Sequence, residues 1–147
     1  MANYQHILIA ADFSDHGQQV TARAQELAQR YQAKLSICHI IEDYPITDFA
    51  YEPMISVDID MRDALLESGK KQILAMSNKL TIPVENQWVE FGSPNHDIVR
   101  LAQENNADLI VIGSHGRHGI KLLLGSTANA VLHHAQCDVL AVRLSDK

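Results

Sequence analysis

The chain has 147 residues, of which 46% are hydrophobic and 20% are charged, and its formal net charge is −6. This composition is typical of a soluble globular protein, and the length predicts one domain over residues 1–147. The negative charge argues against nucleic acid as a partner, because proteins that bind it normally carry a clustered basic face. No apolar run approaches the ~20 residues that span a bilayer and no signal peptide is apparent, so we predict a cytoplasmic protein without membrane attachment.

The first predicted elements are two strands separated by a helix. Residues 7–11 and residues 35–41 are short apolar runs, as expected of buried strands. Between them, apolar residues at helical spacing predict a helix that begins after a cap at Ser14. The predicted buried stripe of this helix consists of Val20, Ala24, Leu27, Ala28 and Tyr31.

A long connection is predicted over residues 42–57, which contain prolines and aromatic residues without a sustained period. Loops of this length are often functional, so this one is a candidate to close over a ligand. A helix follows at about residues 59–80 and a third strand at about residues 86–91. Ser93 and Pro94 then provide a cap residue and a proline at the first helical position, which predict another helix. Its predicted buried residues are Ile98, Leu101 and Ala102.

The last predicted elements are a strand over residues 109–113, a helix opened by residues 125–127 and a strand over residues 139–144. Strands and helices thus alternate along the whole chain, which predicts the α/β class: an open, doubly wound, five-stranded parallel sheet with helices on both faces. We predict the strand order 3-2-1-4-5, which places a crevice between the carboxyl ends of the first and fourth strands. The stripe of the last helix is predicted to contain Leu124, Ala128, Val131, Leu132 and Ala135.

Glycines and hydroxyl residues fill residues 113–127, between a buried strand and a helix. Glycine lets the backbone approach a ligand closely, and the unpaired N–H groups of a helix start favour anions, so this segment predicts a nucleotide site. It matches neither the Walker loop nor the dinucleotide fingerprint. The alternative is ordinary turn and cap chemistry. Arg117, His118 and Lys121 are cations in or beside this loop, which either meet phosphate oxygens or are solvated.

Asp12 follows the first strand and is the carboxylate that we expect at the crevice. At a strand end it can accept hydrogen bonds from a ribose or coordinate a hydrated divalent metal beside phosphates. The alternative is that it only orients the turn before Ser14. No general base other than Asp12 accompanies the predicted site and no hydrolase motif is present, so no catalytic residue is predicted.

Cysteine and histidine carry no predicted redox or transition-metal chemistry. Cys38 and Cys137 lie in or just before separate predicted strands, where cysteine usually acts as a small hydrophobe. His115, His118 and the pair at 133–134 lack the spacing of a metal site. The only metal that we consider is Mg²⁺ carried by a nucleotide near Asp12.

The chain resembles the universal stress protein family, of the UspA type, over its full length. Nucleotide-binding members carry Gly-x2-Gly-x9-Gly-[Ser/Thr]; here eight residues, not nine, separate Gly116 from Gly125. The resemblance implies an adenine nucleotide, with AMP, ADP and ATP as alternatives, and Mg²⁺ as an optional companion. The matching segments are residues 6–14, 39–41, 108–113 and 137–142, together with the glycine loop from Gly113 to Ser126.

The resemblance also assigns roles to individual residues. Ala10 and Ile40 match positions that line the adenine, and the backbone of Ile40 would read its edge. Asp12 matches the residue that meets the ribose or the metal, and Gly113 and Gly116 match glycines under the ribose and phosphates. The predicted nucleotide site is completed by Ala11, Ile112, Arg117 and His118, and by Gly125, Ser126 and Thr127 at the phosphate-binding helix start.

The function implied by the resemblance is that of a nucleotide-binding regulatory protein of the stress response, acting on an unidentified protein partner. The resemblance further implies a homodimer, commonly through the fifth strand around Val139 to Val142, which fits an otherwise exposed apolar edge. Two alternatives remain open: a nucleotide-free dimeric adaptor, and a slow ATPase or self-phosphorylating protein with Ser126 or Thr127 as acceptor.

Overall fold

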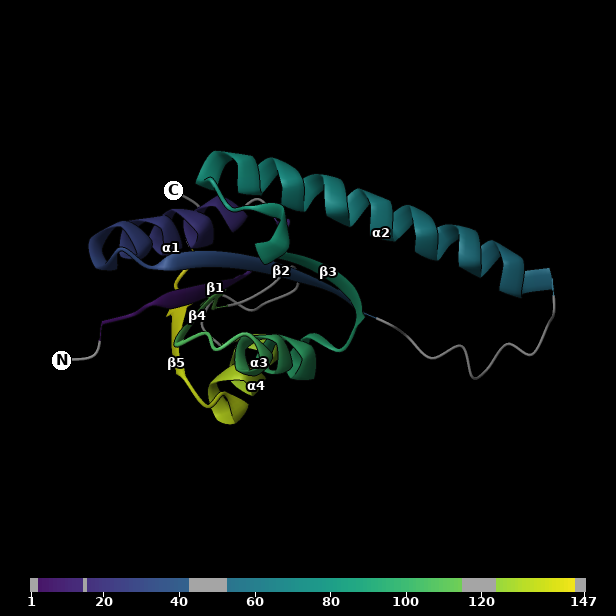
Figure 1. Cartoon of the computed structure of the whole chain (residues 1–147). Helices are drawn as coiled ribbons and strands as arrows, with labels where there is room; N and C mark the ends of the chain where they lie inside the picture. Colours follow the sequence, from purple (N-terminus) through teal and green to yellow (C-terminus); the bar gives the residue numbers. More distant parts are fainter. Residues whose placement is uncertain (1–2, 15, 43–52, 115–123, 145–147) are drawn as a thin grey trace.

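The computed structural model describes residues 3–14, 16–42, 53–114 and 124–144 (Figure 1). It confirms the predicted α/β class, with a five-stranded parallel sheet in the order β3-β2-β1-β4-β5. The strands are β1 (His6–Ala10), β2 (Lys34–Glu42), β3 (Gln87–Gly92), β4 (Leu109–Gly113) and β5 (Asp138–Val142).

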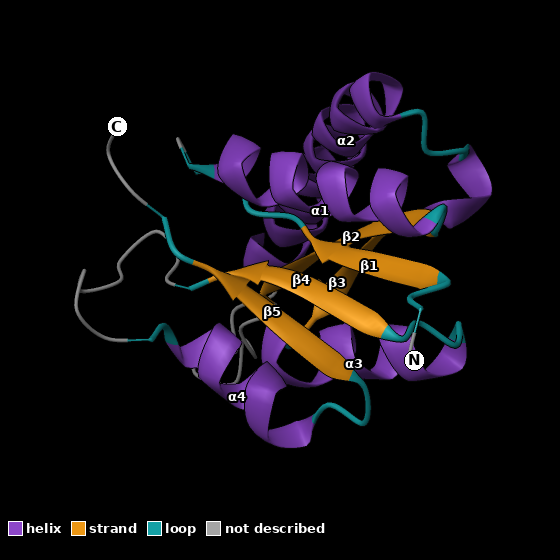
Figure 2. Cartoon of the chain, turned by 90° about the vertical axis from the view of Figure 1, so that its left-hand side faces the viewer, coloured by secondary structure: helices purple, strands orange, loops and turns teal. Residues whose placement is uncertain are grey.

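Helices cover both faces of the sheet, as predicted for a doubly wound fold (Figure 2). On one face lie α1 (Gly17–Tyr31) and α2 (Pro53–Leu80), and a 3₁₀ turn, η1 (Val84–Asn86), leads from α2 into β3. On the other face lie α3 (Pro94–Glu104) and α4 (Ser126–His134). No helix among the described residues combines the length and hydropathy needed to cross a membrane.

The positions of β1 and β4 inside the sheet explain why the sequences of these two strands are continuously apolar. Every residue of β1 and β4 is buried, because each strand is covered by helices on both faces and flanked by strands on both edges. Side chains alternate between the faces, so Ile7 and Ile9 join the core under α1 and α2, whereas Leu8 and Ala10 join the core over α3 and α4. Burying each large aliphatic side chain contributes about 1.5–3 kcal/mol.

Helix α1 begins later than predicted, and Ser14 is not its cap. The cap position belongs to His16, and the helix starts at Gly17. The reason is a turn between β1 and α1. In this turn the Ser14 N–H donates to Asp12 Oδ1 at 2.8 Å, and the Gly17 N–H donates to the Ser14 carbonyl at 3.0 Å. At the other end, Tyr31 is 39% exposed rather than buried and packs edge-to-face on Tyr4.

Helix α2 begins at Pro53, so the predicted connection over residues 42–57 is too long. Proline is compatible with a first helical turn, but the apolar period is weak there because the amino-terminal half of α2 extends beyond the sheet (Figure 1). Ile59, Met61 and Leu65 are accordingly 52%, 59% and 50% exposed.

Near the carboxyl end of the chain, the end of β5 and the buried face of α4 also differ from the prediction. Strand β5 ends at Val142 rather than at residue 144, although Leu144 is still buried. Leu124 precedes α4 and Leu132 lies on its outer side, so both are exposed instead of contributing to the buried stripe. Helical spacing alone therefore overestimated the width of the buried face of α4.

A buried histidine joins the amino ends of β1 and β2. His6 Nδ1 lies 3.0 Å from the Asn105 carbonyl, and Nε2 lies 2.5 Å from Ser36 Oγ. Because a carbonyl only accepts, the neutral tautomer that carries its proton on Nδ1 fits both contacts. Burial lowers the pKa of His6, which keeps the ring uncharged.

We expect acid to destabilise the wild-type protein more than a His6→Gln variant. The lowered pKa means that the contribution of His6 to stability is complete above its ordinary value of 6.5 and declines as the pH falls from there toward the folded value. Urea unfolding between about pH 7.5 and about pH 5 measures the difference. Parallel pH profiles for the two proteins would contradict this role of His6.

Ser77 lies fully buried on α2, and its hydroxyl has no hydrogen-bond partner among the described residues. Ser77→Ala is expected to raise the free energy of unfolding by about 1 kcal/mol, because it removes an unsatisfied polar group. Ser36→Ala is the matched control, since Ser36 is equally buried but its hydroxyl contacts His6. It should lower stability in the same urea titration; a loss of stability in Ser77→Ala would refute the argument.

Candidate functional site

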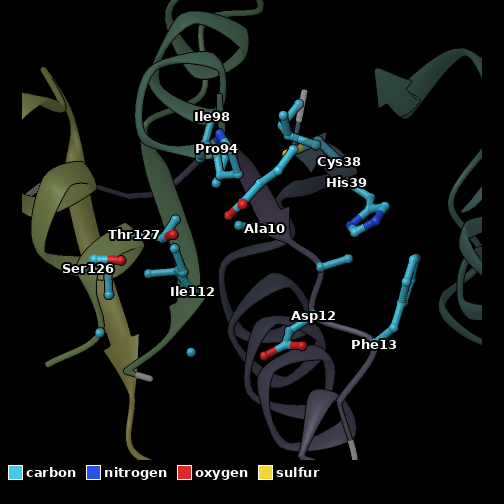
Figure 3. A pocket seen from close by; sticks show the side chains of 16 residues that line it. Ala10, Asp12, Phe13, Cys38, His39, Pro94, Ile98, Ile112, Ser126 and Thr127 are labelled. Atoms are coloured by element: carbon cyan, nitrogen blue, oxygen red, sulfur yellow. The ribbon is translucent and has the colours of Figure 1, made fainter. Parts of the chain in front are cut away.

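A cavity of about 400 Å³ lies at the carboxyl ends of β1, β2 and β4, where the winding of the sheet reverses (Figure 3). Its volume is within the range of small-molecule sites, and its position is that expected of ligand sites in open α/β sheets. The described residues that line it are 10–13, 38–40, 42, 94, 98, 112–113 and 125–128.

Most of the predicted site residues lie in the lining of this cavity. Residues from the first strand end, the second strand and the fourth strand meet those of the α4 start, although they are far apart in sequence. Gly116, Arg117 and His118 lie outside the described residues, as does Lys121. The predicted residues that line the cavity are Ala10, Ala11, Asp12, Ile40, Ile112, Gly113, Gly125, Ser126 and Thr127.

The start of α4 offers backbone donors to the cavity. Gly125 occupies the cap position and has no side chain that could bond the first N–H groups of the helix. Its own N–H donates to the Ser114 carbonyl at 2.6 Å, which holds the helix start beside the end of β4. Among the described residues nothing bonds the N–H groups of residues 126–128, so this end of the cavity suits an anion.

Asp12 does serve the turn that follows β1, and it also lines the cavity. One carboxylate oxygen, Oδ1, accepts the Ser14 N–H at 2.8 Å, while the side chain lies at the cavity wall (Figure 3). The backbone here is held by α1, because Gly17 packs so closely that a Cβ at this position would collide with the Asp12 carbonyl oxygen. Glycine at 17 therefore fixes the strand end that carries Asp12.

The opposite part of the cavity is apolar, and the backbone N–H and C=O groups of Ile40 border it. The β1–β2 pairing ends with Ala10 opposite Cys38, and the Ala11 N–H donates to the Cys38 carbonyl at 2.8 Å. Backbone groups of a strand alternate between its two edges, so those of Ile40 point to the same edge as those of Cys38. No backbone bond between Ile40 and the segment after β1 is present among the described residues, which leaves an adjacent donor and acceptor at the cavity.

Cys38, Pro94 and Ile98 line the same cavity as Ile40, and Figure 3 shows these three side chains. Burial raises the pKa of the Cys38 thiol to about 12, so it is neutral at physiological pH. Cys38 thus acts as part of an apolar surface, as its sequence context predicts. This surface suits the face of a heterocyclic base better than a charged group.

Sequence analysis did not identify seven of the lining residues as site residues: Phe13, Cys38, His39, Glu42, Pro94, Ile98 and Ala128. Phe13 and His39 form one side, with ring centroids 4.2 Å apart, and Pro94 and Glu42 border the apolar end. Strand alternation contains the signal for Glu42, because it lies two residues after Ile40 and therefore on the same face. No comparable pattern marks Phe13, which follows the strand end.

The described lining is acidic rather than basic. It contains the carboxylates of Asp12 and Glu42 and no lysine or arginine. The start of α4, with its backbone N–H groups and the hydroxyls of Ser126 and Thr127, therefore presents hydrogen-bond donors to an anion. The cations of the predicted loop belong to residues 115–123, outside the described part.

Comparison with known proteins gives a consistent result. A model of the universal stress protein family matches residues 3–143. Universal stress protein A homolog 2 of Coxiella burnetii (strain RSA 493 / Nine Mile phase I) is 41% identical over 145 residues, which cover 98% of each chain. The structure is similar to universal stress protein UspA from Lactobacillus plantarum, with 30% identity, a TM-score of 0.75 and coverage of 97% of this chain and 100% of that one.

A second solved structure adds information on ligands within this group. It is a universal stress protein in complex with cAMP, 27% identical, with a TM-score of 0.63 and coverage of 98% of this chain and 100% of that one. The family match spans nearly the whole chain, and the relative from Coxiella burnetii aligns over 98% of its own length. The chain therefore belongs to the universal stress protein family.

Proposed function

We propose that the protein binds an adenine nucleotide in the cavity between β1 and β4 and acts as a regulatory protein of the stress response. The observation that carries this proposal is the meeting, in one cavity of about 400 Å³, of the uncapped start of α4 with the open backbone edge at Ile40. The first feature suits phosphate and the second suits a base. AMP, ADP and ATP are the candidate ligands.

The phosphate end of the proposed site is the first turn of α4. Its N–H groups and helix dipole favour negative charge, and the hydroxyls of Ser126 and Thr127 add further donors. Asp12 lies at the wall toward the same end and is positioned to accept a ribose hydroxyl or to bind Mg²⁺. Mg²⁺ would supply charge neutralisation between the phosphates and this carboxylate.

The base end is the apolar surface beside Ile40. The Watson–Crick edge of adenine presents a ring-nitrogen acceptor next to an amino donor, and the N–H and C=O of Ile40 form the complementary pair. Recognition through the backbone explains why an apolar residue suffices at this position. The universal stress protein that was crystallised with cAMP, also an adenine nucleotide, supports this choice of base.

We further propose that the protein is a homodimer through β5. This strand lies at the edge of the sheet and pairs only with β4 among the described strands (Figure 2). The Ser114 N–H donates to the Val142 carbonyl, so the backbone groups of Val139 and Ala141 alternate to the outer edge. Half-buried apolar side chains along this edge would be covered by a second β5 across a two-fold axis.

A first test removes one N–H group from the phosphate end. Ser126 is the first residue of α4, where proline is tolerated, and Gly125 has the extended backbone (φ −63°, ψ 157°) that a following proline requires. Ser126→Pro is expected to lower AMP affinity about tenfold and to leave adenosine binding unchanged, because it deletes a donor to phosphate. Calorimetric titration measures both affinities.

Ser126→Ala is the matched control, since it removes the hydroxyl and keeps the N–H group. It should bind AMP more tightly than Ser126→Pro. For the wild type, a nucleotide at a hundredfold excess over its Kd stabilises the fold by about 2.7 kcal/mol. Absence of any thermal shift with AMP, ADP and ATP would favour the nucleotide-free adaptor instead.

The proposed dimer is tested with Ala141→Pro. This change removes an outward N–H group of β5 without removing a bond between β4 and β5, so we expect monomers. Ala141→Val keeps the N–H group and should remain dimeric. Sedimentation velocity measures the mass of both variants, and a dimeric Ala141→Pro protein would show that the interface lies elsewhere.

A further inference from the structure

The amino-terminal half of α2 carries exposed apolar side chains that the core does not use. The guanidinium carbon of Arg62 lies 4.1 Å from the centre of the Phe91 ring, and Gly69 is buried against β3, so these positions of α2 face the sheet. Met61 and Leu65 lie on another side of the helix and are 59% and 50% exposed. This half of α2 extends beyond the sheet (Figure 1), and no described element covers the two side chains.

Met61 and Leu65 belong to a continuous stripe of apolar and small residues, which we call the apolar stripe of α2. Residues 61, 64, 65 and 68 follow the spacing i, i+3, i+4, i+7, which places side chains on one face of a helix. Ala64 and Ser68 are exposed, like the two larger residues. A second helix can pack closely along such a face, because its large side chains fit beside the small ones.

An acidic stripe runs directly beside the apolar stripe. It consists of Asp60, Asp63 and Glu67, which are all exposed and follow the spacing i, i+3, i+7. None of these carboxylates forms an ion pair with another described residue. The one basic residue among residues 58–69 is Arg62, which lies over Phe91. This side of α2 is therefore both apolar and negatively charged.

The charge of the acidic stripe distinguishes between possible occupants. A second copy of the chain, whose net charge is −6, would bring the same acidic stripe alongside. Like charges that flank the apolar seam of a helix pair oppose its formation. A helix with apolar residues at the same spacing and lysine or arginine beside them complements both stripes.

We propose that the apolar and acidic stripes of α2 form a docking surface for a basic amphipathic helix of another protein. The surface goes beyond nucleotide binding, because it belongs to α2 alone and shares no residue with the lining of the cavity. It assigns a chemical character to the partner of the proposed regulatory protein.

The test uses three fluorescently labelled synthetic peptides and the full chain. The first peptide has leucine and lysine at helical spacing, the second has glutamate in place of lysine, and the third has the composition of the first in an order that forms no apolar face. Fluorescence anisotropy measures their affinities, and only the first should bind. Met61→Ser/Leu65→Ser is expected to lower its affinity about tenfold, because the apolar stripe loses its two large side chains.

Val84→Ser/Leu132→Ser is the matched control for this double variant. It also replaces two exposed apolar residues, 70% and 43% exposed, but both lie outside α2. It should bind the leucine–lysine peptide with wild-type affinity. Thermal melting of both double variants verifies that neither loses its fold.

A second pair of variants tests the acidic stripe. Glu67→Gln should lower the affinity for the leucine–lysine peptide about threefold at low salt, and this difference should shrink as the salt concentration rises. Glu85→Gln changes the net charge by the same amount at an exposed position of η1. It should therefore leave the affinity unchanged.

Two results would overturn the proposed docking surface. One is equal binding of the leucine–lysine peptide and its reordered form, or unchanged affinity in Met61→Ser/Leu65→Ser. The other is a lower mass of this double variant than of the wild type in sedimentation velocity without peptide, which would assign the stripe to a second copy of the chain. The peptide titrations contain no nucleotide, so their failure is distinct from a failure to bind AMP.

Discussion

The end of the β1–β2 pairing is the constraint on which the site depends. β1 stops at Ala10, whereas β2 continues to Glu42 with β3 on one edge and, in the part of the chain that the structure describes, no strand on the other. Backbone N–H and C=O groups in a partly buried position need partners, and here the sheet does not supply them. A ligand with complementary groups, or water in its absence, is the natural partner. The cavity is thus a consequence of strand lengths and winding rather than of any single side chain.

Close packing of helix starts on strand ends gives this cavity fixed walls. Gly17 brings α1 against the carbonyl of Asp12, and Gly92 lets Asp97 cap α3 beside β2. Glycine is needed at both positions because a larger residue would meet backbone or carboxylate atoms. At the opposite, amino-terminal ends of β1 and β2, the buried contact between His6 and Ser36 joins the two strands. Walls fixed before a ligand arrives reduce the entropy that binding must overcome.

Sequence reasoning predicted the class, strand order and crevice because these follow from strong periodic signals. β1 and β4 are continuously apolar and short, which leaves little choice of element. The start of α2 was missed because the helix there leaves the sheet and no longer shows a buried stripe. Ser14 was assigned to a cap because an Asx turn and a helix start use the same residue types. Glu42 was not predicted because the resemblance matched only Ile40 in this strand, although side-chain alternation places Glu42 on the same face.

The hydrogen bond between the Gly125 N–H and the Ser114 carbonyl closes the glycine loop at its base. With the two ends tied, the distance from the end of β4 to the first turn of α4 is set by this contact and not by the number of residues between them. Insertion or deletion within residues 115–123 then changes the perimeter of the loop while its anchor points stay in place. The eight residues between Gly116 and Gly125, in place of the nine in the family motif, therefore need not change the distance between the end of β4 and the first turn of α4.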